Sequence, residues 1–121
     1  ASQILGLSLK RNSHSGYDAT NDKGERFQIK GRRLDPTNKS RQLGVIRNLE
    51  TNDFDYLIGV LFDRDFKVIE AYKIPQHVIK EYAGFSSHQN GHILQLRGDI
   101  LSNQHVQNLT YLFVKGNNLK D

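Results

Sequence analysis

The 121-residue sequence contains no cysteine, no methionine and no tryptophan, and only two prolines. Without cysteine, a disulfide framework and a cysteine–zinc centre are both excluded, and a reducing cytoplasm is compatible with that absence. No apolar run reaches the length of a membrane span, and the sequence shows no signal-peptide pattern at its start. We therefore expect a cytoplasmic protein with no membrane partner.

The remaining composition is that of an ordinary globular protein. Hydrophobic residues make up 36% of the chain and charged residues 25%, which fits a soluble class with a real core. A chain of this length supports one hydrophobic core but not two. We predict a single domain over residues 1–121.

Acidic residues are scarce between residues 26 and 47, where Asp35 stands alone against seven basic side chains, seven minus one or +6. The whole chain carries +4, so everything else sums to −2. Local positive charge is the usual footprint of nucleic-acid binding, although solvated basic loops also occur in proteins without such a partner. The seven are Arg26, Lys30, Arg32, Arg33, Lys39, Arg41 and Arg47. We expect the last five of these to bind a nucleic-acid backbone.

Residues 16–33 predict a β-hairpin. Apolar and polar residues alternate from Arg26 to Arg32, as in a strand whose side chains point to opposite faces in turn. A three-residue loop, residues 22–24, with Gly24 in the left-handed conformation, is a common hairpin connection. This loop would place Asp18 opposite Gln28, whereas a two-residue loop would place it opposite Phe27.

In the first register, three polar side chains converge. Asp18 offers a carboxylate, Gln28 an amide oxygen, and the main-chain carbonyl of Ile29 a third oxygen. A hard cation such as Mg²⁺ binds such oxygens at about 2.1 Å. Lys30 follows on the face of Gln28, where an ammonium could hold a phosphate or stabilise developing charge. Metal, water and a nearby cation are what phosphodiester hydrolysis requires.

At these residues the chain resembles the PD-(D/E)XK nuclease superfamily, whose pattern is an acid on one strand and then Glu or Gln, any residue and Lys on the next. Here the pattern falls on Asp18 and on Gln28-Ile29-Lys30. The resemblance covers roughly residues 4–80. It implies a restriction-endonuclease-like fold and a Mg²⁺-dependent DNA endonuclease of restriction or repair type, in which Mn²⁺ can substitute. It further implies Asp18 and Gln28 as metal ligands and Lys30 as the catalytic lysine.

Two departures from the family pattern bear on the metal. Gln28 stands where glutamate is commoner, so the site carries one negative charge less. Many members also supply a glutamate from an N-terminal helix, and no acid precedes Asp18 here. Residues 1–6 look like the last turn of a helix closed by Gly6. We therefore expect that the start of this helix, and the acid with it, lie upstream of Ala1.

The rest of the chain predicts an α/β fold, a mixed central sheet with flanking helices. A long polar connection spans residues 34–52. The expected later elements are a buried strand over 55–62, a strand over 66–73, a helix from Pro75 to Gly84, a polar loop over 85–91, a strand over 92–97 and a closing helix from 103 to 113.

Other functions are weighed against the nuclease. His88 and His92 have helical metal-ligand spacing, but Gly91 and polar neighbours favour solvated loop histidines. A non-catalytic nucleic-acid-binding module on the same fold is the main alternative. A protein-interaction domain that meets an acidic partner is the third. The sequence leaves homodimerisation and the type of DNA open.

Overall fold

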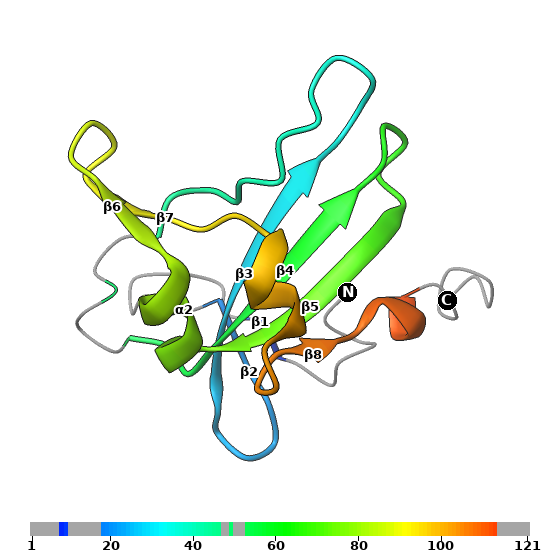
Figure 1. The fold of residues 1–121 in the computed structure, drawn as a ribbon. Helices are drawn as coiled ribbons and strands as arrows, with labels where there is room; N and C mark the ends of the chain where they lie inside the picture. The colour runs from blue at the N-terminus through cyan, green and yellow to red at the C-terminus, as the bar shows by residue number, and fades with distance from the viewer. Residues whose placement is uncertain (1–7, 10–17, 47–48, 50–52, 114–121) are drawn as a thin grey trace.

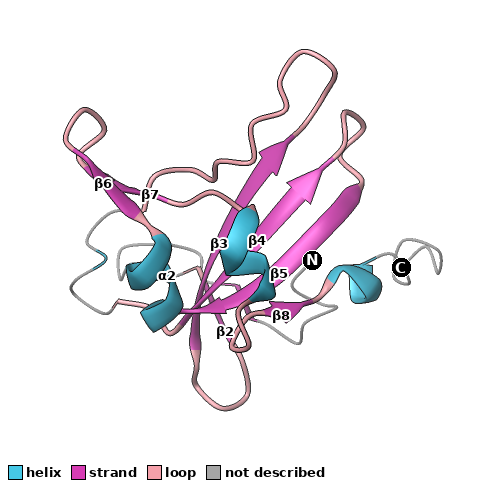
Figure 2. Ribbon diagram, viewed as in Figure 1, coloured by secondary structure: helices cyan, strands magenta, loops and turns pink. Residues whose placement is uncertain are grey.

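A mixed six-stranded sheet organises the computed structural model, which describes residues 8–9, 18–46, 49 and 53–113 (Figure 1, Figure 2). Its strands lie in the order β1-β2-β3-β4-β5-β8. They are β1 (Ser8–Leu9), β2 (Ala19–Thr20), β3 (Arg26–Arg33), β4 (Tyr56–Phe62), β5 (Val68–Pro75) and β8 (Gln107–Asn108). The predicted α/β class with a mixed sheet is confirmed.

The centre of the sheet combines a parallel and an antiparallel pair. β3 and β4 are parallel, with Phe27 beside Tyr56, and β4 and β5 are antiparallel. Parallel neighbours cannot be joined by a tight turn. The long connection between β3 and β4 therefore has to return to the end of the sheet where β3 began.

Both faces of the sheet are covered by apolar groups. In β4 the five central residues are buried, which confirms the predicted central strand. Leu57 and Leu61 belong to a core with Leu43 and Ile46 from the β3–β4 connection. Ile58 belongs to the opposite core, whose other buried members are Ala19, Phe27, Val60, Ala71, Leu109 and Phe113. Strand alternation thus divides the side chains between two cores.

Helix α2 (Gln76–Tyr82) follows β5 directly. Pro75 is its N-cap, where the missing N–H costs no helical hydrogen bond. Val78 and Ile79 are fully buried in the core of Leu57. The helix predicted between Pro75 and Gly84 is confirmed.

A two-stranded sheet follows α2. β6 (Gly84–Ser86) and β7 (Gly91–Ile93) form an antiparallel hairpin, with Phe85 beside His92, that projects from the body of the molecule (Figure 1). The predicted loop over 85–91 is therefore wrong at its ends, and the predicted strand over 92–97 begins earlier and is shorter. Asn90-Gly91 is a turn signal that favours such a hairpin.

The expected closing helix from residue 103 is also wrong over its first half. A short 3₁₀ helix, η2 (Gly98–Ser102), precedes β8, and residues 110–113 are helical. The edge of β5 has main-chain groups that require partners. Leu109 N–H donates to the Ala71 carbonyl (2.7 Å), and the Thr110 hydroxyl accepts from Ala71 N–H (3.0 Å). Pairing with this edge keeps the segment extended.

Among the described residues, α2, η2 and the helical residues 110–113 flank the sheet. Helices in the described ranges are too short or too polar to cross a lipid bilayer. The expected helical turn over residues 1–6 lies outside the described residues, and so does Arg47.

Candidate active site

The turn of the β2–β3 hairpin has the predicted three-residue loop. Asn21 N–H donates to the Glu25 carbonyl (3.2 Å) and Gly24 N–H to the Asn21 carbonyl (3.1 Å). Gly24 has φ +78°, the left-handed conformation that glycine adopts without steric cost. Ala19 then lies beside Phe27, which confirms the expected register along β2.

The Asn21 side chain fixes this turn. Its Oδ1 accepts hydrogen bonds from Lys23 N–H (3.1 Å) and Glu25 N–H (3.0 Å), an arrangement that asparagine often makes in turns. Its Nδ2 donates to the Glu25 carboxylate (2.7 Å), and this bond holds the pKa of Glu25 below its usual value. The hairpin thus specifies its register locally.

At Asp18 the chain departs from regular pairing. Continued by one residue, the register would set Asp18 opposite Gln28, but Asp18 is a bend residue whose N–H donates to the Phe27 carbonyl (2.7 Å). Its Oδ2 accepts a hydrogen bond from Ile29 N–H (2.8 Å). The carboxylate therefore lies at the edge of β3, next to the Gln28–Ile29 peptide.

The main-chain carbonyl of Ile29 lies at this edge. In a strand, the N–H and C=O of one residue leave on the same edge, so the Ile29 carbonyl faces the β2 side, as its N–H does. The Gln28 amide oxygen is buried. If Asp18, Gln28 and the Ile29 carbonyl bound one hard cation, they would supply one charged and two neutral oxygen donors.

Lys30 lies two residues beyond Gln28, on the same face of β3. Its Nζ donates to the Val45 carbonyl (3.0 Å), and the side chain is half-buried. An ammonium has three N–H donors, so this bond leaves two for a phosphate or a water. The sequence alone did not identify Val45 as a partner of Lys30. Every residue has a main-chain carbonyl, and the sequence does not show which one lies near Lys30.

A glycine lets the segment that carries Val45 approach the sheet. Gly59 lies beside Lys30 on β4. A Cβ at Gly59 would stand 3.0 Å from Leu96 Cδ1 and 3.1 Å from Leu43 Cδ1. Both leucines therefore pack directly against the main chain of Gly59. Residues 43–46, which include Val45, consequently lie close to the sheet.

Arg41 makes a structural ion pair. Its guanidinium donates to both carboxylate oxygens of Glu70 (2.9 and 2.5 Å) and to the Leu96 carbonyl (2.5 Å). Hydrogen bonding to Arg41 holds the pKa of Glu70 below its usual value. The Tyr72 hydroxyl also donates to Glu70 (2.6 Å), and burial is the first cause that raises the pKa of Tyr72 to about 12. We therefore leave Arg41 out of the proposed phosphate-binding set.

The adjacent arginines of β3 point to opposite faces. Arg32 shares the face of Lys30, whereas Arg33 lies on the other face, with its guanidinium 5.0 Å from the centre of the Phe66 ring. Lys39 is exposed on the connection after β3. Arg32, Arg33 and Lys39 remain expected phosphate contacts, but they do not form one row.

Asp55 is paired away from the metal donors. Its carboxylate accepts from the main-chain N–H (2.8 Å) and the guanidinium of Arg26 (3.3 and 3.2 Å). The Arg26 side-chain bonds are the first cause that holds the pKa of Asp55 low. Asp55 thus anchors the start of β3.

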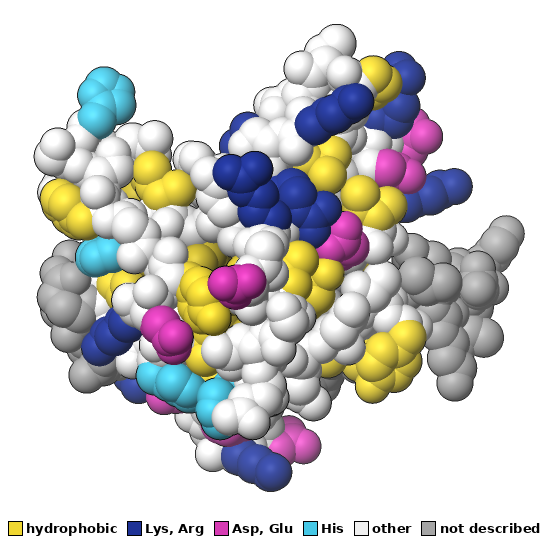
Figure 3. Space-filling model, in the orientation of Figure 1, with side chains coloured by type: hydrophobic (Ala, Val, Ile, Leu, Met, Phe, Trp, Pro, Cys, Tyr) yellow, Lys and Arg dark blue, Asp and Glu magenta, His cyan; other side chains and the backbone are white. Residues whose placement is uncertain are grey.

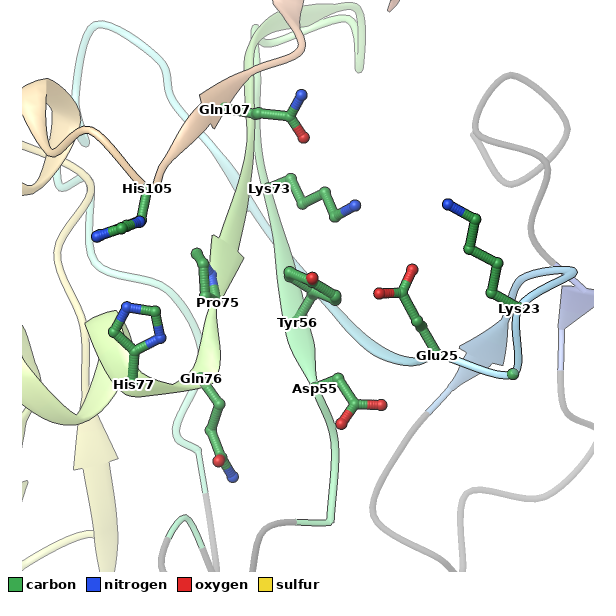
Figure 4. Close-up of a pocket in the computed structure, with 11 residues that line it drawn as sticks. Lys23, Glu25, Asp55, Tyr56, Lys73, Pro75, Gln76, His77, His105 and Gln107 are labelled. Carbon is green, nitrogen blue, oxygen red and sulfur yellow. The ribbon is translucent and has the colours of Figure 1, made fainter.

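A pocket of about 730 Å³ lies on the opposite face of the sheet from Lys30 (Figure 4). Tyr56 and Lys73 line it, and the Lys73 ammonium lies 4.3 Å from the centre of the Tyr56 ring and 5.5 Å from that of Phe27. Glu25 and Lys23 bring opposite charges to its rim. This balance of charge does not favour a phosphate, and the proposed metal donors lie elsewhere.

Basic side chains gather on one projection of the surface. Figure 3 shows dark blue groups, with a few magenta ones among them, over the projecting end of the sheet. The second projection, the β6–β7 hairpin, shows neither colour on this face. The surface between the two is hollowed. The histidines expected as loop residues lie on this hairpin, His92 in β7 and His88 exposed in the turn, and so not on a helix.

Comparison of the chain with models of known protein families and with curated proteins gave no match. No group of three or more His, Cys, Asp or Glu side chains within metal-binding reach occurs among the described residues. A metal site at Asp18 would therefore combine this carboxylate with carbonyl and amide oxygens.

Proposed function

We propose that this protein is a Mg²⁺-dependent DNA endonuclease with a restriction-endonuclease-like fold, in which Mn²⁺ can replace Mg²⁺. The observation that carries the proposal is the Asp18–Ile29 hydrogen bond (2.8 Å). It sets a carboxylate beside the Gln28-Ile29-Lys30 segment, as the family pattern requires. The mixed sheet, with β3 and β4 at its centre, supports the same proposal.

The proposed roles follow from the donor chemistry. Asp18, Gln28 and the Ile29 carbonyl would hold the ion. When bound, Mg²⁺ supplies a Lewis acid that lowers the pKa of its water and neutralises phosphate charge. Lys30, held by the Val45 carbonyl, orients the scissile phosphate and stabilises the charge that develops on it. Arg32 and Lys39 hold flanking phosphates.

The first test is a cleavage assay on duplex DNA with Mg²⁺ and Mn²⁺ for the wild type and Lys30→Ala. We expect Lys30→Ala to lower the cleavage rate about 100-fold or more, because a positioned cation acts chiefly in the transition state. Affinity for DNA should change little. Lys80→Ala, an exposed lysine on α2, is the matched control, and near-wild-type cleavage by Lys30→Ala would remove Lys30 from the chemistry.

Gln28→Glu tests the metal site separately. A second carboxylate strengthens the binding of a hard cation, so the variant should reach half-maximal cleavage at a lower Mg²⁺ concentration. Asp18→Asn removes the sole carboxylate of the set and should abolish cleavage. An unchanged Mg²⁺ requirement in both variants would place the ion elsewhere.

The second candidate function is a nucleic-acid-binding module that does not cleave. The low charge of the donor set favours it, since one carboxylate binds Mg²⁺ weakly. Intact DNA in both metals, together with salt-dependent binding, would establish this module. No binding even at low salt would instead indicate a protein-interaction domain with an acidic partner.

A further inference from the structure

The β6–β7 hairpin presents an uncharged polar tip. No Asp, Glu, Lys or Arg occurs from Ala83 to Leu96. Ser87, His88 and Asn90 are exposed in the turn, and Phe85 is 62% exposed at its base. Hydrogen-bonding side chains without formal charge, beside an exposed aromatic ring, are unlike the basic surface expected for phosphates.

The hairpin is held along both edges of β7. One edge pairs with β6. On the other edge His92 and Ile46 exchange main-chain hydrogen bonds (2.8 and 2.9 Å), and Leu43 N–H donates to the Leu94 carbonyl (2.9 Å). The β6–β7 hairpin, which we call the arm, is thus part of a three-stranded arrangement at its base. This arrangement fixes the direction in which the arm projects.

The segment that fastens the arm also holds Lys30. Val45, whose carbonyl accepts from Lys30 Nζ, immediately precedes Ile46, which pairs with His92. The arm and the ammonium are therefore fixed relative to each other through adjacent residues. A duplex whose phosphate is bound at Lys30 would therefore meet the arm at a fixed position relative to that phosphate.

We propose that the β6–β7 hairpin enters the major groove of duplex DNA and contacts base edges, an inference that rests on the proposed DNA function. The major groove admits a two-stranded ribbon and displays distinct donors and acceptors at each base pair. Gln, Asn and Ser pair with those groups, and Phe85 can contact a thymine methyl. The basic projection then binds phosphates, and the arm selects sequence.

The test is cleavage of a library of duplexes with randomised base pairs, in Mg²⁺, followed by sequencing of the cut ends. A double variant, His88→Ala with Gln89→Ala, is compared with the wild type and with Gln104→Ala/His105→Ala. The control removes the same two residue types from another exposed turn. We expect the arm variant to lose about tenfold in preference at one or two base pairs, and the control to keep the wild-type preference.

The same library selected by binding in EDTA separates the two proposals. If the wild type cleaves nothing but selects sequences, the nuclease proposal fails and the arm proposal stands. Guanine N7 should be protected from methylation by the wild type and not by the arm variant, since N7 lies in the major groove. A flat wild-type preference, an arm variant with unchanged preference, or protection of adenine N3 instead would overturn the arm proposal.

Discussion

The Glu70 carboxylate accepts hydrogen bonds from two side chains, one distant in sequence and one on its own strand. Arg41 is 29 residues away in sequence, and Tyr72 is two residues away on β5. Arg41 and Glu70 have side chains that are 24% and 29% exposed. A bidentate pair at this depth is stronger than a surface salt bridge.

We expect Glu70→Gln to lower the free energy of unfolding by about 1 to 3 kcal/mol at pH 7, because the Arg41 charge loses its partner. The pKa of Glu70 is lowered in the folded state, so its contribution is complete above the unfolded value of 4.5 and is lost as the pH falls through the folded value. The deficit should therefore shrink between pH 7 and pH 3.

Urea unfolding at several pH values measures this effect. Glu81→Gln, on the exposed side of α2, is the matched control and should change stability by less than about 0.5 kcal/mol. A Glu70→Gln deficit that stays constant down to pH 3 would mean that the pair does not govern the titration of Glu70.

Charge in the sequence did not reveal which basic residues are available to a ligand. Arg41 belonged to the basic stretch, yet its acceptors are Glu70 and the Leu96 carbonyl, from other strands and loops. Arg26 is likewise paired with Asp55. Such pairings depend on tertiary structure, whereas a count of charged residues along the chain gives only the sign of each charge.

Local turn chemistry, in contrast, made one element predictable in detail. Gly24 takes φ +78°, and nothing lies within 4 Å of a Cβ built there. Any cost of substitution at this position is therefore conformational. The left-handed conformation costs a residue with a Cβ roughly 1 to 2 kcal/mol.

We expect Gly24→Ala to lower the free energy of unfolding by about 1 kcal/mol and to lower cleavage as well, because the turn sets the register that brings Asp18 to Ile29. Gly84→Ala is the matched stability control: it too has space for a Cβ, and its φ is not positive. Chemical unfolding and the duplex cleavage assay are the measurements. Equal stability of the two variants would show that the turn tolerates alanine.

The elements that sequence misjudged are those decided by tertiary partners. The segment from residue 103 has apolar residues at helical spacing. Gln107 and Asn108 nevertheless pair with the edge of β5 and form a strand of the sheet. β6 and β7 are too short for periodicity to identify, and they are stabilised by pairing with each other and with Ile46. The bend at Asp18 also depends on a partner, Ile29 N–H.

At the scale of the whole molecule, binding to DNA should depend on salt through a small number of charges. Among the described basic residues of the 26–47 stretch, Arg32, Arg33 and Lys39 remain after the two ion-paired arginines and the proposed catalytic Lys30 are set aside. Each neutralised phosphate contributes about −0.9 to the slope of log K against log salt. Three contacts would give a slope of about −2.7.

Fluorescence anisotropy with a labelled duplex in EDTA measures this slope. Lys39→Ala should reduce its magnitude by about 0.9 and weaken binding similarly for all sequences, while Lys80→Ala should leave it unchanged. A slope near zero would exclude phosphate binding as the main source of affinity.

The parallel pairing of β3 with β4 has a consequence for the protein during its synthesis. Asp18, Gln28 and Lys30 all precede Tyr56, the first residue of β4. A growing chain that has not reached Tyr56 carries every proposed catalytic side chain, but it lacks the strand beside which Gln28 and Lys30 are held. The proposed catalytic residues are thus synthesised before β4, the strand that supports them. The proposed nuclease centre can therefore assemble only some time after its own residues have been translated.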